Sequence, residues 1–464
     1  METIIDISYL LGAICFIYGL KMLSHPRTAR NGNIIASAGM LIAVVTTVYL
    51  GRSDISLSML AIAMIVGSII GAFFAIRVEM TQMPQLVAIF NGFGGGASAL
   101  VASSEFLKNG PESSLFLLIS IILSVLIGTL TFTGSFIAFG KLQGLVTTKP
   151  VTFRGQQILN AIIALTIITF AYLTPSYGIN AFYIIISLSA LLGILLVIPI
   201  GGADMPVVIS LLNSYSGIAA AMTGFVLVSS GNTSAGNALI ICGSLVGASG
   251  MILTQIMCKG MNRSLANVIF GAVGGEVEGS SGEAKQVNIK SYSTEEAAMI
   301  FDAAEKIIIV PGYGLAVAQA QHAVRELADY LESTGKKVYY AIHPVAGRMP
   351  GHMNVLLAEA NIPYELLKDL DDINPEFKDC DVALVLGAND VVNPAARTDQ
   401  SSPIYGMPIL DVDKSRTVII NKRTMNTGFA GVQNELFGYD NSIMVFGDAK
   451  DMLVKLLSDL KELD

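Results

Sequence analysis

The sequence predicts a polytopic α-helical membrane bundle of about nine spans, followed by an α/β domain with a parallel sheet. The 464-residue chain has a mean hydropathy of +0.62, which is too apolar for one water-soluble domain. Long apolar runs fill its first part, whereas strand and helix patterns alternate after Ile300. We therefore expect a membrane domain at 1–263, a flexible connector at 264–293 and an α/β domain at 294–464.

Charge follows the same division. Residues 1–263 carry 11 basic and 7 acidic side chains, whereas residues 264–464 carry 17 and 29. The acidic second part argues against a nucleic-acid partner. The four cysteines are scattered, and His322, His343 and His352 show no metal-ligand spacing, so we expect no metal site and interpret the histidines as surface or supporting residues.

Nine segments are apolar over the roughly 20 residues that a helix needs to cross a bilayer core of about 30 Å. They are 4–22, 33–50, 57–76, 83–104, 115–138, 156–174, 181–200, 205–229 and 236–258. Several are rich in small residues, which let helices approach closely, and the stretch Gly92–Ser98 is the extreme case.

The orientation follows from the charges of the loops. With the N-terminus outside, nine Lys and Arg residues fall on the inside, and only Arg52 and Lys108 fall on the outside. This bias places the α/β domain in the cytoplasm.

Three polar residues in or beside the spans are candidates for a hydrated ion path, because such groups are costly in a membrane without partners. They are Asn91, Asp204 and Asn213. An interhelical hydrogen bond would be the simpler explanation for each Asn, and an N-cap before Pro206 would be the simpler one for Asp204. Between the two domains, 271–293 is rich in Gly, Ser, Glu and Lys, as expected for a flexible connector.

In the second part, five candidate strands alternate with helices. The strands are 306–310, 337–342, 382–387, 416–421 and 442–446. Apolar residues at helical spacing from Val317 to Leu331 predict a first helix, and a last amphipathic helix is expected near 448–461.

The junction of the first strand and helix carries the glycines of a dinucleotide fold. Gly312 permits a tight turn, and Gly314 leaves room for a pyrophosphate near the start of the helix. The third position of this pattern is Val317 instead of Gly or Ala, so the helix–strand packing must differ from the usual one. The pattern predicts a Rossmann-like domain.

The second strand ends in His343, where an NAD site usually has an acid for the ribose 2′-hydroxyl. A 2′-phosphate would need cations, which Lys422 and Arg423 could supply after the fourth candidate strand. A solvated basic pair is the equal alternative.

Three loops rich in Gly, Pro or Asn, at 345–352, 387–394 and 424–431, are expected to line the ligand site. Ordinary surface turns are the alternative. Asp390 is also a titratable acid near the expected phosphate site, and so a candidate for a proton-linked switch.

Six stretches are more specific than any glycine pattern. They are GADMPVV at 202–208 through LNSYSG at 212–217, IMCK at 256–259 through MNRS at 261–264, PGYGLAVAQAQ at 311–321, HPVAGRMPGHMNVLLAEA at 343–360, GANDVVNPAA at 387–396 and KRTMNTGFAGVQN at 422–434. On these stretches the chain closely resembles the beta subunits of proton-translocating NAD(P) transhydrogenases, over nearly its whole length.

The resemblance implies an enzyme of the bacterial cytoplasmic membrane that couples hydride transfer from NADH to NADP⁺ with proton movement. NADP(H) would bind to this chain, with the segment 422–434 as a lid. An alpha subunit would carry the NAD(H) domain and further membrane helices, in a dimer of alpha-beta units. No side chain would act as a chemical catalyst, and Asn91, Asp204 and Asn213 are candidates for the proton path.

The expected cofactor-binding residues are Gly312, Tyr313, Gly314, Val317, Val345, Ala346, Gly347, Arg348, Met349, Pro350, Gly387, Ala388, Asn389, Asp390, Val391, Gly406, Met407, Lys422, Arg423, Thr424, Met425, Asn426, Thr427, Gly428, Phe429, Asp448 and Ala449. Two departures matter. Asn91 stands where some relatives have His and cannot take up a proton, and Phe429 stands where others have Tyr.

Two other classes of function are alternatives. A channel or transporter gated by a nucleotide-sensing domain predicts a filter motif or a substrate-sized polar cavity, and the spans show neither. A membrane-anchored dehydrogenase predicts a separate substrate domain, and one or two spans would suffice to anchor it.

Overall fold

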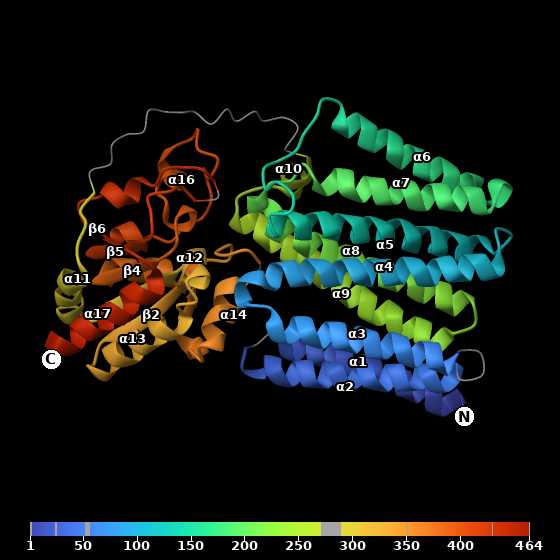
Figure 1. The fold of residues 1–464 in the computed structure, drawn as a ribbon, viewed down its shortest axis with the longest axis horizontal. Helices are drawn as coiled ribbons and strands as arrows, with labels where there is room; N and C mark the ends of the chain where they lie inside the picture. The colour runs from blue at the N-terminus through green and yellow to red at the C-terminus, as the bar shows by residue number, and fades with distance from the viewer. Residues whose placement is uncertain are drawn as a thin grey trace. The chain divides into compact units, whose positions relative to one another are not determined.

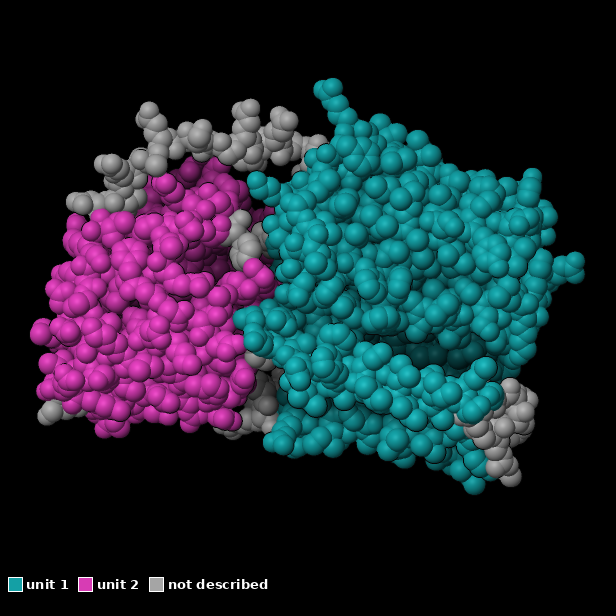
Figure 2. Space-filling model, in the orientation of Figure 1, with its two compact units in different colours: residues 1–255, 266–274 teal, residues 256–265, 275–464 magenta. Residues whose placement is uncertain are grey.

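The computed structural model describes residues 2–23, 26–51, 56–270, 289–349, 351–428 and 430–463. The chain divides into two compact units, residues 1–255 with 266–274 and residues 256–265 with 275–464 (Figure 2). Most of the predicted connector, 271–288, lies outside the described residues. The two units are called the helical unit and the sheet unit below, and each is considered by itself.

Nine long helices dominate the part of the helical unit that the structure describes (Figure 1). They are α1 Glu2–Leu23, α2 Pro26–Gly51, α3 Leu57–Arg77, α4 Met83–Asn109, α5 Leu115–Leu142, α6 Gln156–Tyr177, α7 Ile179–Val197, α8 Met205–Ser229 and α9 Thr233–Gly260, with the short α10 Leu265–Phe270 after them. All nine are long and apolar enough to cross a membrane, which confirms the predicted bundle.

Helix α5 packs closely against α4, α7 and α8, and α4 also packs against α8. A Cβ on Gly95 of α4 would lie 2.7 Å from the carbonyl oxygen of Gly128 on α5, and one on Gly128 would lie 2.5 Å from the oxygen of Gly95. Only glycine at both positions permits this approach. Gly67 and Gly71 on α3, by contrast, have no atom within 4 Å of such a Cβ in the described chain.

The described residues of the sheet unit form six parallel strands in the order β3-β2-β1-β4-β5-β6. They are β1 Lys306–Pro311, β2 Lys337–Ile342, β3 Leu367–Asp369, β4 Val382–Leu386, β5 Thr417–Lys422 and β6 Ser442–Phe446. This is the strand order of the Rossmann fold, with its switch point between β1 and β4. The predicted α/β class is confirmed, and the three-residue β3 is the strand that the sequence did not indicate.

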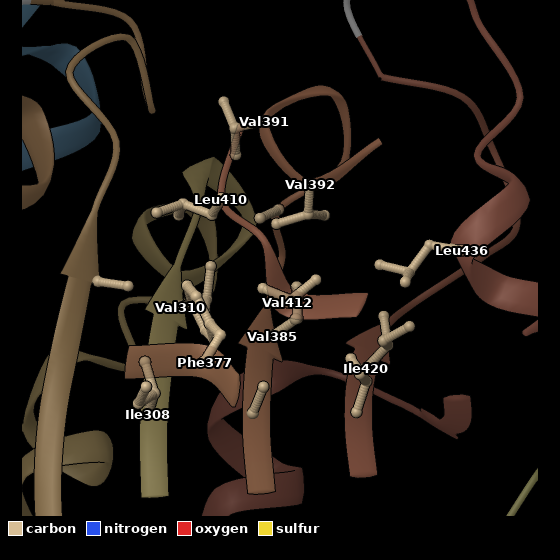
Figure 3. Close-up of a cluster of buried hydrophobic side chains, with 14 of the residues drawn as sticks. Ile308, Val310, Phe377, Val385, Val391, Val392, Leu410, Val412, Ile420 and Leu436 are labelled. Atoms are coloured by element: carbon tan, nitrogen blue, oxygen red, sulfur yellow. The ribbon is translucent and has the colours of Figure 1, made fainter. Parts of the chain in front are cut away.

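Both faces of the central strands are buried, which explains their continuous apolar sequences. On one face, Ile308, Val310, Val385 and Ile420 pack with Phe377 and other apolar residues from the connecting segments (Figure 3). The helices of this unit include α11 Thr294–Asp302, α13 Gln321–Ser333, α14 His352–Glu359 and α17 Ala449–Leu463. Helix α17 packs against both α11 and α13.

The predicted first helix is wrong as a continuous element. The structure has a short α12, Tyr313–Val317, and then α13 from Gln321. Between them Gln319 adopts a left-handed conformation with φ of +48°, and the amide of Ala320 donates to Leu315 O at 3.1 Å. This arrangement ends a helix, because it satisfies its last carbonyls. Val317 is consequently more than one-third exposed and not packed between helix and strand.

Candidate functional site

The carboxyl ends of β1, β4, β5 and β6 are joined by the backbone of the loops that follow them. Gly312 N donates to Leu386 O at 2.9 Å, and Gly387 N donates to Asn421 O at 3.3 Å. Gly447 N donates to Lys422 O at 3.1 Å. The predicted loops therefore meet at one edge of the sheet, where open α/β folds bind their ligands.

The glycines of the β1 turn are required by the neighbouring loop. A Cβ on Gly312 would lie 2.5 Å from the backbone of Ala388, and one on Gly314 would lie 2.6 Å from Cα of Gly387. Gly314 N donates to Gly387 O at 3.0 Å, and Gly387 itself has a φ of +64°. The small size of these residues thus serves the contact between the β1 and β4 loops, in addition to any space that a ligand needs.

The ring of Tyr313 is in contact with the side chain of Arg348. The guanidinium carbon of Arg348 is 4.4 Å from the centre of the Tyr313 ring, which is the geometry of a cation–π contact. Burial raises the pKa of the Tyr313 phenol, and the charge of Arg348 opposes this shift in part. The phenol is therefore neutral near pH 7, and the pair joins the β1 turn to the loop after β2.

The segment after β5 folds back on the loop after β4. Ala430 N donates to Asp390 Oδ2 at 3.0 Å, and Lys422 Nζ donates to Asn426 O at 2.8 Å. With the Asn389 amide turned so that its oxygen faces these donors, the oxygen accepts from Lys422 Nζ at 3.1 Å and from Gly428 N at 2.7 Å. Lys422, Gly428 and Ala430 are thus bound to Asn389 and Asp390.

Gly428 passes directly over the Asp390 carboxylate, since a Cβ at this position would lie 2.4 Å from Oδ1. Lys422 Nζ also lies 4.7 Å from the centre of the Phe437 ring. Burial lowers the pKa of Lys422, and the nearby Asp390 charge partly restores it. A cavity of about 200 Å³ adjoins this segment. Its lining includes Asn389, Met425, Thr427, Gln433, Asn434 and Phe437.

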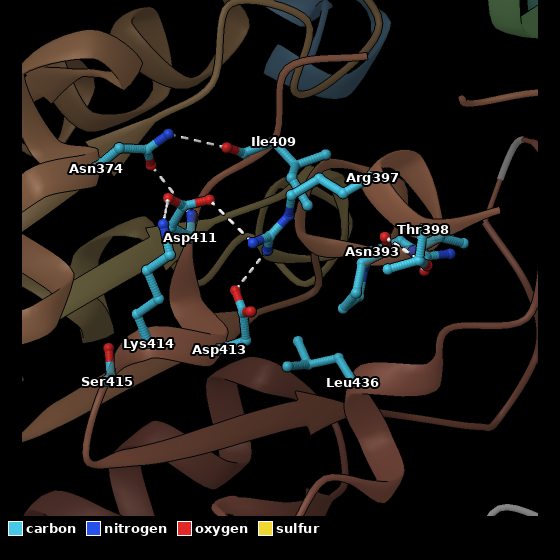
Figure 4. A network of polar contacts seen from close by, with 12 residues as sticks. Asn374, Asn393, Arg397, Thr398, Ile409, Asp411, Asp413, Lys414, Ser415 and Leu436 are labelled. Carbon is cyan, nitrogen blue, oxygen red and sulfur yellow. Dashed lines mark hydrogen bonds and ion pairs between the residues drawn. The ribbon is translucent and has the colours of Figure 1, made fainter. Parts of the chain in front are cut away.

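A network of polar contacts stabilises the segment that follows the β4 loop (Figure 4). Arg397 contacts Asp413 at 2.6 Å and Asp411 at 3.6 Å, and Lys414 also pairs with Asp411. Asn374 donates to Ile409 O at 3.0 Å and accepts from Asp411 N at 3.0 Å. These contacts fix the segment that includes Gly406 and Met407, where Gly406 N donates to Ala396 O at 2.8 Å.

Most of the remaining predicted residues lie at the same edge of the sheet. Val345, Ala346, Gly347 and Met349 are on the loop after β2, and Val391 is buried after β4. Asp448 accepts from Lys450 N at 3.0 Å at the start of α17. Arg423 and Thr424 are exposed, whereas Pro350 and Phe429 lie outside the described residues. The binding roles of all these residues stay predictions.

Sequence reasoning missed two buried amides that hold the loops together. Asn393 donates to Gln433 O at 3.1 Å, and Asn434 donates to Asn389 O at 3.0 Å. Both residues occur within the specific stretches after β4 and β5, so a search for loop amides there could have found them. Among the histidines, His322 is exposed, whereas His343 and His352 are buried behind the β2 loop.

In the helical unit, Asn91 Nδ2 donates to Ile209 O at 3.2 Å, which confirms the interhelical hydrogen bond as its structural role. Asn213 follows Ile209 by one helical turn, on the same face of α8. Asp204 stands at the N-cap position of α8, but its side chain accepts no capping hydrogen bond within that described helix. The structure thus places Asn91 beside the face of α8 that carries Asn213.

Fold and site together define a polytopic membrane protein with a Rossmann-like domain whose loops converge at the switch point. The family model described as NAD(P) transhydrogenase beta subunit matches residues 5–459. The chain is 51% identical over 460 residues to the NAD(P) transhydrogenase subunit beta of Rhodospirillum rubrum, covering 97% of each protein. A second protein of that name, from a designated strain of the species, matches equally. The chain belongs to the NAD(P) transhydrogenase beta subunit family, a family of membrane-bound oxidoreductases.

Proposed function

We propose that this chain is the NADP(H)-binding subunit of a proton-pumping transhydrogenase. Its membership of the family over residues 5–459 is the observation that carries this proposal. An alpha subunit would supply the NAD(H) domain and further membrane helices, in a dimer of alpha-beta units. We place the helical unit in a bacterial inner membrane and the sheet unit in the cytoplasm, as the loop charges favour.

The residues at the sheet edge fit a 2′-phosphorylated dinucleotide. No acid stands at the end of β2, where unphosphorylated NAD is usually recognised. His343 cannot replace that acid, because one ring nitrogen contacts Pro408 O and the other accepts from Val345 N. Lys422 and Arg423 at the end of β5 supply the cations that a 2′-phosphate requires.

Bound NADP(H) supplies the hydride chemistry, for which the protein needs no acid or base. The residues of this chain bind, orient and enclose it. Arg348 and Tyr313 join two of the loops. The segment 422–434 would act as a lid, of which Gly428 and Ala430 contact Asp390. Closure of this lid would exclude water from the reacting ring.

Coupling requires two states of the chain that the proton and the nucleotide bind differently. We propose that protonation in the helical unit, near Asn91, Asp204 and Asn213, changes the affinity of the sheet unit for NADP(H). Asp204 is the titratable group of the three. Moving one charge across about 150 mV is worth about 3.5 kcal/mol, a few hundred-fold in the reaction quotient.

The test uses the complex of both subunits in sealed vesicles, with NADH-driven reduction of an NADP analogue followed beside a pH-sensitive dye. We expect hydride exchange with a matched pH change inside the vesicles. Exchange with no pH change would contradict the coupling, and tighter binding of NADH than of NADPH by this chain would contradict the assigned site. The variant Asn213→Leu tests the polar path, since it should uncouple exchange from the pH change.

A further inference from the structure

The loop between β2 and α14 has a buried histidine at each of its two ends. His343 follows β2 directly, and His352 begins α14. Both side chains are nearly inaccessible to solvent. Neither histidine is among the individual residues expected to bind the cofactor, whereas residues 345–349 between them are.

The hydrogen bonds of His343 determine its tautomer. Nε2 lies 2.7 Å from Pro408 O, and Nδ1 accepts from Val345 N at 3.2 Å. A carbonyl can only accept and an amide can only donate, so the proton is on Nε2 and Nδ1 is bare. Burial lowers the pKa of His343 to about 4, which keeps the ring neutral near pH 7.

His352 uses the same ring nitrogen at the other end of the loop, whereas its Nε2 has no hydrogen-bond partner among the described residues. Its Nδ1 accepts from Arg348 N at 3.0 Å, which again requires a bare Nδ1 and a neutral ring. Burial, together with the charge of Arg348, lowers the pKa of His352 to about 4. The charged group facing the ring is Arg348, and the titratable group beside it is Tyr313, whose ring centre is 6.1 Å away.

The loop is shaped to fit the His352 ring. Gly347 has a φ of +108°, and a Cβ there would lie 2.5 Å from His352 Nδ1. The ring therefore takes the space of a side chain at 347 while it accepts from the next amide. Arg348, fixed by this hydrogen bond, places its guanidinium above Tyr313 of the β1 turn.

We propose that His343 and His352 are positioning residues that hold the loop 345–349, through backbone hydrogen bonds at its two ends, in the form that binds the nucleotide. This inference rests on the proposed function, since it assumes that the loop contacts NADP(H). The acceptor nitrogen Nδ1 is the atom that matters at each histidine. A side chain that keeps an acceptor at this place should therefore preserve the loop.

The test compares His352→Asn with His352→Gln in the complete complex in detergent. The Asn side chain places an oxygen where Nδ1 lies, whereas the Gln oxygen is one bond further out. We expect His352→Gln to weaken NADPH binding about tenfold by calorimetric titration, and His352→Asn to stay within about twofold of the unchanged protein. The exposed His322→Asn is the matched control and should leave binding unchanged.

Hydrogen exchange provides a readout that needs no nucleotide. The amide of Arg348 should exchange slowly in the unchanged protein and in His352→Asn, and at least tenfold faster in His352→Gln. If His352→Asn and His352→Gln had the same exchange rate at Arg348 and the same affinity for NADPH, the inference would be overturned. This comparison does not depend on whether the more drastic variant His352→Leu folds. If the unchanged protein failed to bind NADPH, the proposed function would fall, while the exchange result would still decide the role of His352.

Discussion

The helical unit and the sheet unit differ in how their buried polar side chains are hydrogen-bonded. In the helical unit the side chains donate to backbone carbonyls: Asn91 to Ile209 O, Ser214 to Gly247 O, and Lys141 to three oxygens. In the sheet unit they also accept from backbone amides, as His343, His352 and Asp390 do.

The difference follows from the backbone. Every interior amide of a helix is bound to the carbonyl four residues earlier, so that only the second lone pair of each carbonyl is left for a side chain. Gln85 and Gln156 show this directly, because each donates its amide to a carbonyl while its own oxygen has no partner among the described residues. In loops, many backbone amides have no carbonyl partner, so a side-chain acceptor can bind them. A buried donor in a helix bundle is thus mainly structural, whereas a buried acceptor in a loop fixes local shape.

The largest expected effect concerns Lys141. Its side chain is fully buried and donates to Ile198 O at 2.6 Å, Ile200 O at 2.8 Å and Lys149 O at 3.2 Å. The change Lys141→Met leaves three carbonyls without this donor, and should lower the free energy of unfolding by about 3 kcal/mol or more. Unfolding in mixed detergent, followed by circular dichroism, measures it. The exposed Lys149→Met is the control. Equal stability of the two variants would contradict the stabilising role of buried donors in the helical unit.

The acceptor role in the sheet unit predicts a dependence of stability on pH. His343 and His352 have pKa values near 4 in the folded protein, below the value of about 6.5 expected when unfolded. The unfolded chain therefore binds protons that the folded chain excludes. Their stabilisation is complete above about pH 6.5 and is lost as pH falls toward 4, by about 3 kcal/mol per histidine at most.

Thermal unfolding of the sheet unit between pH 7 and 4.5 would measure this dependence. The variant His343→Asn should reduce the loss of stability, because Asn does not titrate, whereas His352 still does. The exposed His322→Asn should keep the full dependence. An unchanged profile in His343→Asn would show that other groups produce the acid sensitivity.

The sequence predicts features that depend on local patterns, but not features that depend on a single backbone conformation or on contacts between distant residues. Helices and long strands were predictable, because apolar periodicity is local and strong in α5 or β4. The three residues of β3 carry no such pattern, and the break after α12 depends on one left-handed residue, Gln319. The contacts of Asn393 and Asn434 join residues about 40 positions apart, so only the folded chain reveals them.

A moderate effect is expected from the glycines that let helices approach. The change Gly95→Ala puts a methyl group 2.7 Å from Gly128 O and should cost about 2 kcal/mol, because α4 and α5 must move apart. Gly67→Ala on α3 is the control, since open space surrounds that position in the described chain. Equal loss in both variants would point to a general intolerance of alanine in these helices, and would refute close packing as the cause.

The smallest expected effect concerns Arg423, and it distinguishes cationic side chains that stabilise the fold from those that would bind a ligand. Lys141 directs its donors to backbone, whereas Arg423 is exposed at the carboxyl end of β5. If a 2′-phosphate binds there, Arg423→Gln should weaken NADPH about tenfold, about 1.4 kcal/mol, and leave NADH nearly unchanged. Parallel calorimetric titrations measure both. Arg416, before the other end of β5, pairs with Asp381 and serves as the control. An equal loss in Arg416→Gln would mean that overall charge, and not a contact at the end of β5, selects the phosphorylated cofactor.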